Sequence, residues 1–238
     1  MSTHVVIGGA GQIGHAIASV LEERHEVYRV DPPAGLYEVP SNRVHVMHVA
    51  IRWSDTFEQD VQDYADRFDP FLVVVHSTVP VGTCDRHGWV HAPVRGRHPN
   101  LAQGVNTFPM HFGGKNAHIV ASAFDGLVGD AILHDRAADT EAGKLWELAQ
   151  LGIQARVMQE IMAYCVDRGL DFDAVYTQFA ESYNAGYSVL EPQFVRPVLE
   201  WSPPPLGGHC VAQNSPMLGS EFVRDLLEPI SPSYIDWN

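Results

Sequence analysis

A glycine-rich turn near the start of the chain constrains the fold more than any other part of the sequence. The segment Gly9-Ala10-Gly11-Gln12-Ile13-Gly14 follows an apolar run at residues 4–8 and opens a helical pattern at residues 12–23. Residues 26–30 form a second apolar run, which ends at Asp31. Short apolar runs bounded by turn residues are typical of buried strands, whereas apolar residues at a 3.6-residue period predict a helix. The order predicts strand, turn, helix and strand, the opening of a parallel α/β sheet.

The same turn has the pattern of a dinucleotide-binding site. Its candidate cofactor-binding residues are Gly9, Gly11, Gln12, Ile13 and Gly14. Their amides and the helix N-terminus can hold a pyrophosphate, because glycine places no side chain in its way. Asp31 follows Gly14 by 17 residues, where a carboxylate accepts the ribose hydroxyls of NAD and repels the additional phosphate of NADP. The alternative is a purely structural turn, which the position of Asp31 disfavours, so the sequence predicts NAD as the cofactor.

Strands and helices continue to alternate up to about residue 135. Further strands are predicted at residues 44–49, 71–76, 89–91 and 118–121, and further helices at residues 55–68 and 124–134. The run at residues 71–76 is strongly apolar, as in a parallel strand that is covered on both faces. We therefore expect an α/β protein with a Rossmann-type doubly wound parallel sheet.

Beyond residue 138 the sequence pattern becomes helical. One long helix is predicted at residues 140–168, where Gly169 ends it, followed by helices at residues 172–182 and 215–227 and a loop at residues 207–214. We expect two domains: an NAD-binding Rossmann domain at residues 1–138, and a small helical unit with a long central helix at residues 139–238. The second unit is expected to serve substrate binding and dimerisation.

Composition excludes several classes of function. The formal charge of −14 disfavours a nucleic-acid partner, because it repels polyanions. No apolar stretch approaches the roughly 20 residues needed to cross a bilayer, and the N-terminus lacks a basic region and cleavage site, so we expect a cytoplasmic protein without membrane contact. Three widely spaced cysteines suit a reducing compartment. The 13 histidines show no ligand spacing on a helix, so no metal is expected.

Four segments together resemble the nucleotide-sugar dehydrogenases, the family of UDP-glucose, GDP-mannose and UDP-N-acetylmannosamine dehydrogenases. Taken alone, the Ser-Thr-Val-Pro-Val-Gly-Thr turn at residues 77–83 is more simply a Pro-Gly turn at the end of a strand. The segments that carry the resemblance are the turn at residues 77–83, the substrate-side loop at residues 91–99, the helix start Glu141-Ala142-Gly143-Lys144 and the cysteine loop Gly207-Gly208-His209-Cys210. They occur in the family's order, within the wider 6-phosphogluconate dehydrogenase-like group.

The resemblance implies roles for individual residues. It implies cofactor contacts from Ser77, Thr78, Val79 and Pro80, and catalytic roles for Thr83, Glu141, Lys144 and Cys210. In the family the cysteine forms a thiohemiacetal that loses a second hydride to become a thioester, and the helix lysine supports the developing alkoxide. A neighbouring positive charge, from His209 or Lys144, would favour the thiolate of Cys210. The resemblance also implies a homodimer formed through the long helix.

The sequence departs from the family's pattern at the reaction centre. Leu148 stands where the family has an asparagine, Asn214 where it has an aspartate, and the loop that supplies a hydrolytic glutamate reads Ala92-Pro93-Val94-Arg95. The chain also ends soon after Cys210, so we expect no separate domain that grips the nucleotide of a UDP-sugar. These departures question the thioester hydrolysis step and favour a different or smaller substrate.

Two arginines of the substrate-side loop are candidates for substrate binding. Arg95 and Arg97 can hold an anionic group, because a guanidinium pairs bidentately with phosphate or carboxylate. The alternative is a solvated basic loop. A small anionic or sugar-like molecule is therefore the expected partner.

Three functions remain open from the sequence. The first is an NAD-dependent dehydrogenase with Cys210 and Lys144 at its centre, which transfers a hydride from an alcohol to NAD. The second is a β-hydroxyacid-type dehydrogenase or reductase that does not use Cys210. The third is a non-catalytic NAD-binding protein, for which Leu148 is the discriminating residue.

Overall fold

The computed structural model describes residues 2–96, 100–203 and 209–227. The chain divides into two compact units, Met1–Lys144 and Leu145–Asn238. The predicted roles of the two domains, NAD binding at residues 1–138 and substrate binding at residues 139–238, stay predictions. No helix of the described residues is long and apolar enough to cross a membrane.

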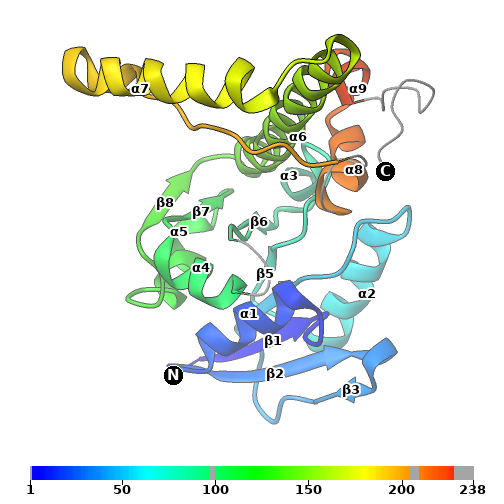
Figure 1. Ribbon diagram of the computed structural model, residues 1–238. Helices are drawn as coiled ribbons and strands as arrows, with labels where there is room; N and C mark the ends of the chain where they lie inside the picture. Colours follow the sequence, from blue (N-terminus) through cyan, green and yellow to red (C-terminus); the bar gives the residue numbers. More distant parts are fainter. Residues whose placement is uncertain (1, 97–99, 204–208, 228–238) are drawn as a thin grey trace. The chain divides into compact units, whose positions relative to one another are not determined.

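The first unit is built on one eight-stranded sheet with the strand order β3-β2-β1-β4-β5-β6-β7-β8 (Figure 1). The strands are β1 Thr3–Ile7, β2 Glu26–Asp31, β3 Leu36–Tyr37, β4 Val46–Val49, β5 Leu72–Val75, β6 Val90–His91, β7 Met110–Gly113 and β8 Ala131–His134. Strands β2, β1, β4, β5 and β6 pair in parallel, as do β7 and β8, whereas β3 and β7 each run antiparallel to the strand before them. The doubly wound, mostly parallel sheet confirms the predicted fold class.

Alternating side chains of the central strands bury both faces of this sheet. Val6 belongs to the apolar cluster that the sheet forms with α1 (Gln12–Leu21), α4 (Leu101–Thr107) and α5 (Ala117–Ala123). Its neighbours Val5 and Ile7 belong to a second cluster, which includes residues of α2 (Phe57–Phe68) and α3 (Thr83–His87). Because successive strand residues point to opposite faces, a strand of uninterrupted apolar residues requires helices on both sides.

Two predicted elements of the first unit are wrong. Residues 118–121 form part of helix α5 instead of a strand, because Ala117, Val120 and Ala121 are buried at helical spacing. Residues 124–134 do not form a helix: they turn and end in strand β8, which pairs with β7. Strand β7 and helices α3 and α4 had no predicted counterpart.

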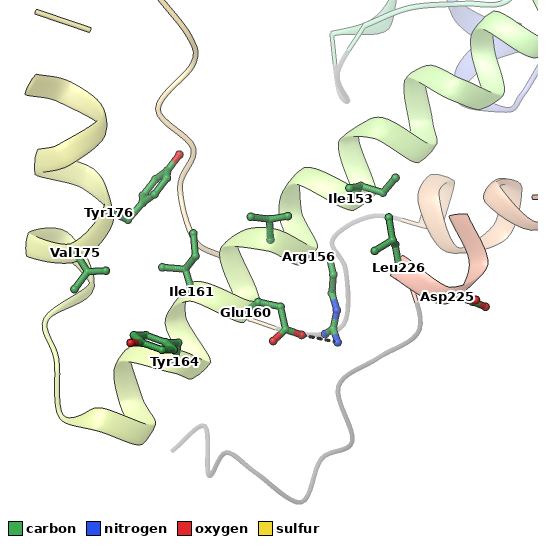
Figure 2. A pocket seen from close by; sticks show the side chains of 10 residues that line it. Ile153, Arg156, Glu160, Ile161, Tyr164, Val175, Tyr176, Asp225 and Leu226 are labelled. Carbon is green, nitrogen blue, oxygen red and sulfur yellow. Dashed lines mark ion pairs between the residues drawn. The ribbon is translucent and has the colours of Figure 1, made fainter. Parts of the chain in front are cut away.

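The second unit is helical. It contains most of the long helix α6 (Ala137–Arg168), a π-helical turn at Asp173–Thr177, and the helices α7 (Gln178–Leu190), α8 (His209–Asn214) and α9 (Glu221–Leu227). The predicted long helix is confirmed, whereas the predicted loop at residues 207–214 contains α8. Residues of α6, the π-helical turn and α9 line a groove of about 610 Å³, in which Arg156 pairs with Glu160 at 2.9 Å (Figure 2).

Candidate functional site

The glycine turn after β1 has the geometry of a phosphate-binding loop. Gly8 adopts φ +78° and donates its N–H to the Val30 carbonyl at 2.8 Å, which ties the turn to β2. A Cβ atom on Gly9 would lie 2.8 Å from the Cβ of Arg29, and one on Gly14 would overlap the carbonyl oxygen of Gly8. These glycines therefore allow α1 to approach the strands closely, which a side chain at either position would prevent.

The N-terminus of α1 is left open toward this turn. Gly11 is the N-cap residue and provides no side-chain cap, so the first amides of the helix, at Gln12, Ile13 and Gly14, are not bonded by a capping side chain. Gly11 is exposed. A helix N-terminus with unpaired amides and a positive dipole end is suited to an anion such as a pyrophosphate.

Asp31 lies at the end of β2 beside this loop, as the spacing predicts. Its Oδ2 accepts a hydrogen bond from the N–H of Ala10 at 3.1 Å, which fixes the carboxylate against the loop. Asp31 also lines a pocket of about 480 Å³. The residues that line this pocket are Ile7, Gly8, Asp31, Pro32, Pro33, Ile51, Asp60, Asp63, Tyr64 and Arg67. Asp31 and Gly8, which begins the glycine turn, thus share one concave site at the carboxyl edge of the sheet.

Sequence reasoning did not identify the contribution of α2 to this pocket. Asp60, Asp63, Tyr64 and Arg67 all line it. Their spacing of three and four residues places them on one face of the helix. The polar spacing was visible in the sequence, but it is equally typical of a solvent-exposed helix face.

The turn at residues 77–83 follows strand β5, which ends at Val75, with His76 between them. The Ser77 hydroxyl donates to the carbonyl of Ile51 at 2.5 Å, and the Thr83 hydroxyl donates to the carbonyl of Pro80 at 2.7 Å. Val79 is buried, and Thr78 and Pro80 are half-buried. The Ser77 hydroxyl therefore ties the turn to the segment after β4, and the Thr83 hydroxyl closes the turn on itself.

Glu141 is buried, and its carboxylate binds the N-terminus of α3. It accepts hydrogen bonds from the N–H of Gly82 at 2.5 Å and of Cys84 at 2.8 Å. Asp85 of α3 binds the N-terminus of α6 in the same way. Its carboxylate accepts hydrogen bonds from the N–H groups of Ala137 and Ala138. Burial, and then the Glu141 charge, raise the pKa of the Cys84 thiol well above its usual range, so Cys84 is held as a thiol.

Lys144 lies close to the carboxyl ends of β5 and β6. His91, the last residue of β6, contacts the Thr140 hydroxyl at 2.8 Å and the Ser77 carbonyl at 3.2 Å, and Lys144 is one helical turn beyond Thr140. The pKa of His91 is lowered to about 3, mainly by burial and also by the charges of His76 and Lys144, against the raising effect of the Ser77 carbonyl. The structure thus brings Ser77, His91 and Lys144 to one region of the first unit.

The remaining predicted site residues have different positions. Arg95 is half-buried, and its guanidinium lies 5.6 Å from the ring centre of Phe108. Arg97 lies outside the described residues. Cys210 is exposed on α8 and belongs to the second unit, so the structure does not place it relative to Lys144. Within the described part of the chain no group of three or more His, Cys, Asp or Glu side chains has a metal-binding arrangement.

The first unit thus has a doubly wound, mostly parallel sheet with the glycine turn and Asp31 at its carboxyl edge. No family model matches the sequence, and no curated protein sequence matches it. The chain is similar in structure to the UDP-D-ManNAc dehydrogenase of Pyrococcus horikoshii, with a TM-score of 0.74, 16% identity, and coverage of 95% of this chain and 68% of that one.

Two further solved structures have a similar fold. The UDP-N-acetyl-mannosamine dehydrogenase of Staphylococcus aureus has a TM-score of 0.70 at 16% identity, over 95% of this chain and 67% of that one. The 3-hydroxyisobutyrate dehydrogenase of Mycobacterium tuberculosis has a TM-score of 0.56 at 18% identity, over 80% of this chain and 74% of that one. At these identities the similarity establishes a shared fold.

Proposed function

We propose that this protein is an NAD-dependent dehydrogenase that oxidises an alcohol group of a small anionic or sugar-like substrate. The single observation that carries the proposal is the pocket at the carboxyl edge of the sheet, which joins Gly8 of the glycine turn to Asp31. The amides at the start of α1 have no capping side chain and suit a pyrophosphate, and the carboxylate of Asp31 beside them suits the ribose hydroxyls. NAD, when bound, accepts the hydride.

The acidic character of the pocket supports NAD over NADP. Asp31, Asp60 and Asp63 contribute three carboxylates to its lining, against the one guanidinium of Arg67. An additional phosphate on the adenosine ribose would be repelled by this excess of negative charge. Selectivity for NAD would therefore come from Asp60 and Asp63 as well as from Asp31.

The chain's own groups also suit hydride removal from an alcohol. Oxidation takes a hydride from the carbinol carbon and a proton from its hydroxyl, so negative charge develops on that oxygen. The ammonium of Lys144 can stabilise this charge, and it lies near Ser77 and His91 in the first unit. Arg95 is the described residue of the substrate-side loop that we assign to an anionic group of the substrate. A homodimer through the long helix remains part of this proposal.

Calorimetric titration with NAD, NADH, NADP and NADPH tests the proposal. We expect preferential binding of NAD or NADH, weakened by about tenfold or more in Asp31→Ala, because ribose hydroxyls lose a charged acceptor. Asp66→Ala is a matched control, because Asp66 is exposed on α2 and does not line the pocket. The absence of binding by all four dinucleotides would contradict the proposal.

The role of Cys210 separates the two enzymatic alternatives. The similarity to 3-hydroxyisobutyrate dehydrogenase favours considering a β-hydroxyacid-type reaction, which needs no thiol nucleophile. If Cys210 forms a covalent intermediate, Cys210→Ser blocks the second hydride transfer and abolishes steady-state turnover, since a serine hydroxyl is a far weaker nucleophile at neutral pH. If the reaction is of the β-hydroxyacid type, kcat stays within about twofold of the wild type. Cys165→Ser, at a buried position of α6, is the control for general effects of losing a thiol.

A further inference from the structure

A line of buried histidines crosses the sheet of the first unit, where two of the rings contact Phe124 edge-on. His4 on β1, His48 on β4 and His76 after β5 are each at most 1% exposed. In the strand register His4 is opposite Val46, and His48 is opposite Val6 and Val74. Each histidine thus lies one strand over and two residues further along than the one before it. The line runs diagonally from the amino edge of the sheet to the carboxyl edge.

Hydrogen bonds join these side chains without interruption. The Ala92 carbonyl lies 2.6 Å from His76 Nδ1, His76 Nε2 lies 2.9 Å from His48 Nδ1, and His48 Nε2 lies 2.8 Å from His4 Nδ1. Beyond His4 the chain continues through the Ser2 hydroxyl, 2.8 Å from His4 Nε2 and 2.9 Å from His25 Nδ1. It ends where His25 Nε2 lies 2.8 Å from the carbonyl of Ala123.

The two ends of this histidine chain set its proton content. The four histidines and Ser2 make six hydrogen bonds, two of which end on backbone carbonyls that can only accept. Each neutral imidazole and the hydroxyl supply one hydrogen, so five groups supply five hydrogens for six bonds. No choice of tautomers removes this deficit, because it follows from having an acceptor at both ends.

We propose that the histidine chain is a proton-binding site, in which the native fold holds one proton more than its neutral side chains supply. The bound proton completes the sixth hydrogen bond. Without it, two acceptor atoms of the chain would face each other with no hydrogen between them, which is costly in a protein interior. This proposal does not rest on the proposed dehydrogenase activity.

The environment assigns the charge to the His25 end. Burial lowers the pKa of His4 to about 3 and that of His76 to about 4, and it lowers the pKa of His48 well below its usual value. These rings therefore stay neutral. His25 is half-buried and donates from both ring nitrogens when it is an imidazolium, to the Ser2 hydroxyl and the Ala123 carbonyl.

The charged groups around this end come from β2, β4 and two loops. Glu26 of β2 accepts a hydrogen bond from the Thr3 hydroxyl at 3.1 Å, and hydrogen bonds from Tyr28 and Asn42 lower its pKa, which keeps it anionic. His45, before β4, accepts from the Thr3 N–H, and Arg24 donates to the Asp125 carbonyl at 2.7 Å. Among these groups Glu26 and Asp125 are carboxylates and Arg24 is a cation.

The assignment fixes every tautomer in the chain. With His25 charged, Ser2 donates to His4 Nε2, and His4, His48 and His76 each carry their hydrogen on Nδ1. His76 adjoins Ser77 and anchors the Ala92 carbonyl, so the filled chain also holds the start of the substrate-side loop. An alternative filling of the chain would place two hydrogens on His76, the ring with a lowered pKa.

Nitrogen-15 NMR of the histidine rings in the full-length protein at pH 7.5 tests the proposal. We expect both ring nitrogens of His25 to be protonated, although an ordinary imidazole, with a pKa near 6.5, is mostly neutral at this pH. His4, His48 and His76 should show the Nδ1–H tautomer. A neutral His25 in the wild-type spectrum would overturn the proposal without any variant.

Ser2→Ala provides the sharper comparison. Without the hydroxyl, three histidines make three bonds toward Ala92 and His25 makes one toward Ala123, so four neutral rings satisfy all four bonds. We expect His25 to be neutral in Ser2→Ala at pH 7.5. Ser122→Ala removes a nearby exposed hydroxyl that bonds only the Ile119 carbonyl and should leave His25 charged. A charged His25 in Ser2→Ala would contradict the count.

A stability measurement gives an independent readout. A native state that binds one more proton than the unfolded state loses stability as the pH rises. Between pH 7 and 8.5, the folding equilibrium constant of the wild type should fall relative to that of Ser2→Ala, by up to about tenfold per pH unit. Parallel pH profiles for the two proteins would overturn the proposal.

Discussion

Single residues decide whether the glycine turn can form. The sequence indicated a phosphate-binding turn, and the structure adds which glycines serve packing. Gly9 and Gly14 face backbone and side-chain atoms at distances that exclude a Cβ, whereas a Cβ on Gly11 would lie 3.2 Å from its nearest neighbour, the Gly8 carbonyl oxygen. Close packing therefore requires glycine at two of the three positions, which the sequence alone does not reveal, and ligand access at Gly11 is part of the proposed function.

Gly14→Ala tests the packing requirement. We expect the free energy of unfolding to fall by about 1–3 kcal/mol, because the new methyl group would overlap the Gly8 carbonyl, which is backbone and moves little. Urea unfolding followed by circular dichroism measures the change. Gly143→Ala on α6 is the control, because nothing lies within 4 Å of the added Cβ there. Helix propensity should make that variant more stable by up to about 1 kcal/mol, and equal effects of the two changes would contradict the packing argument.

At the level of elements, helices α3 and α6 cap each other. The sequence predicted the long helix from its apolar period and assigned Glu141 a catalytic role by resemblance. In the structure the Glu141 carboxylate binds the amides at the start of α3, and Asp85 binds those at the start of α6. Neither contact follows from spacing, since the partners are more than 50 residues apart in the chain. The catalytic assignment of Glu141 remains a prediction.

Asp85→Ala tests this reciprocal arrangement. Loss of the carboxylate leaves the N–H groups of Ala137 and Ala138 without their acceptor, so we expect a loss of about 0.5–2 kcal/mol of stability. Thermal unfolding at constant pH measures it. Asp139→Ala removes an exposed charge from the same first turn of α6 and should cost less, since only its interaction with the helix dipole is lost. A larger loss in Asp139→Ala than in Asp85→Ala would contradict the assignment.

For the molecule as a whole, buried neutral histidines make the folded state less stable at acidic pH. Burial lowers the pKa of His4 and His91 to about 3 and that of His76 to about 4, from about 6.5. A base whose pKa is lowered by folding takes up its proton more readily in the unfolded chain. The stabilisation that these three neutral rings contribute is therefore complete above about pH 6.5 and is lost as the pH falls toward 4. Each ring contributes on the order of 1.4 kcal/mol per pH unit within this window.

His91→Gln removes the one of these three rings that lies outside the histidine chain. We expect the dependence of the unfolding free energy on pH, between pH 6 and 4.5, to become shallower by about 1.4 kcal/mol per pH unit. His118→Gln, at an exposed position, should keep the wild-type slope. Urea unfolding at several pH values gives both slopes, and an unchanged slope in His91→Gln would show that this ring does not titrate with unfolding.

The sequence by itself determined the doubly wound sheet, the glycine turn with Asp31, and the long helix, because each depends on local spacing: apolar runs, glycine positions and a 3.6-residue period. It misassigned α5 and β8, where short apolar runs suit either a helix or a strand and only pairing with β7 decides. Tertiary structure alone decided the α2 wall of the pocket, the reciprocal caps and the histidine chain. Their partners lie on separate strands and helices, so folding, and no period in the sequence, brings them into contact.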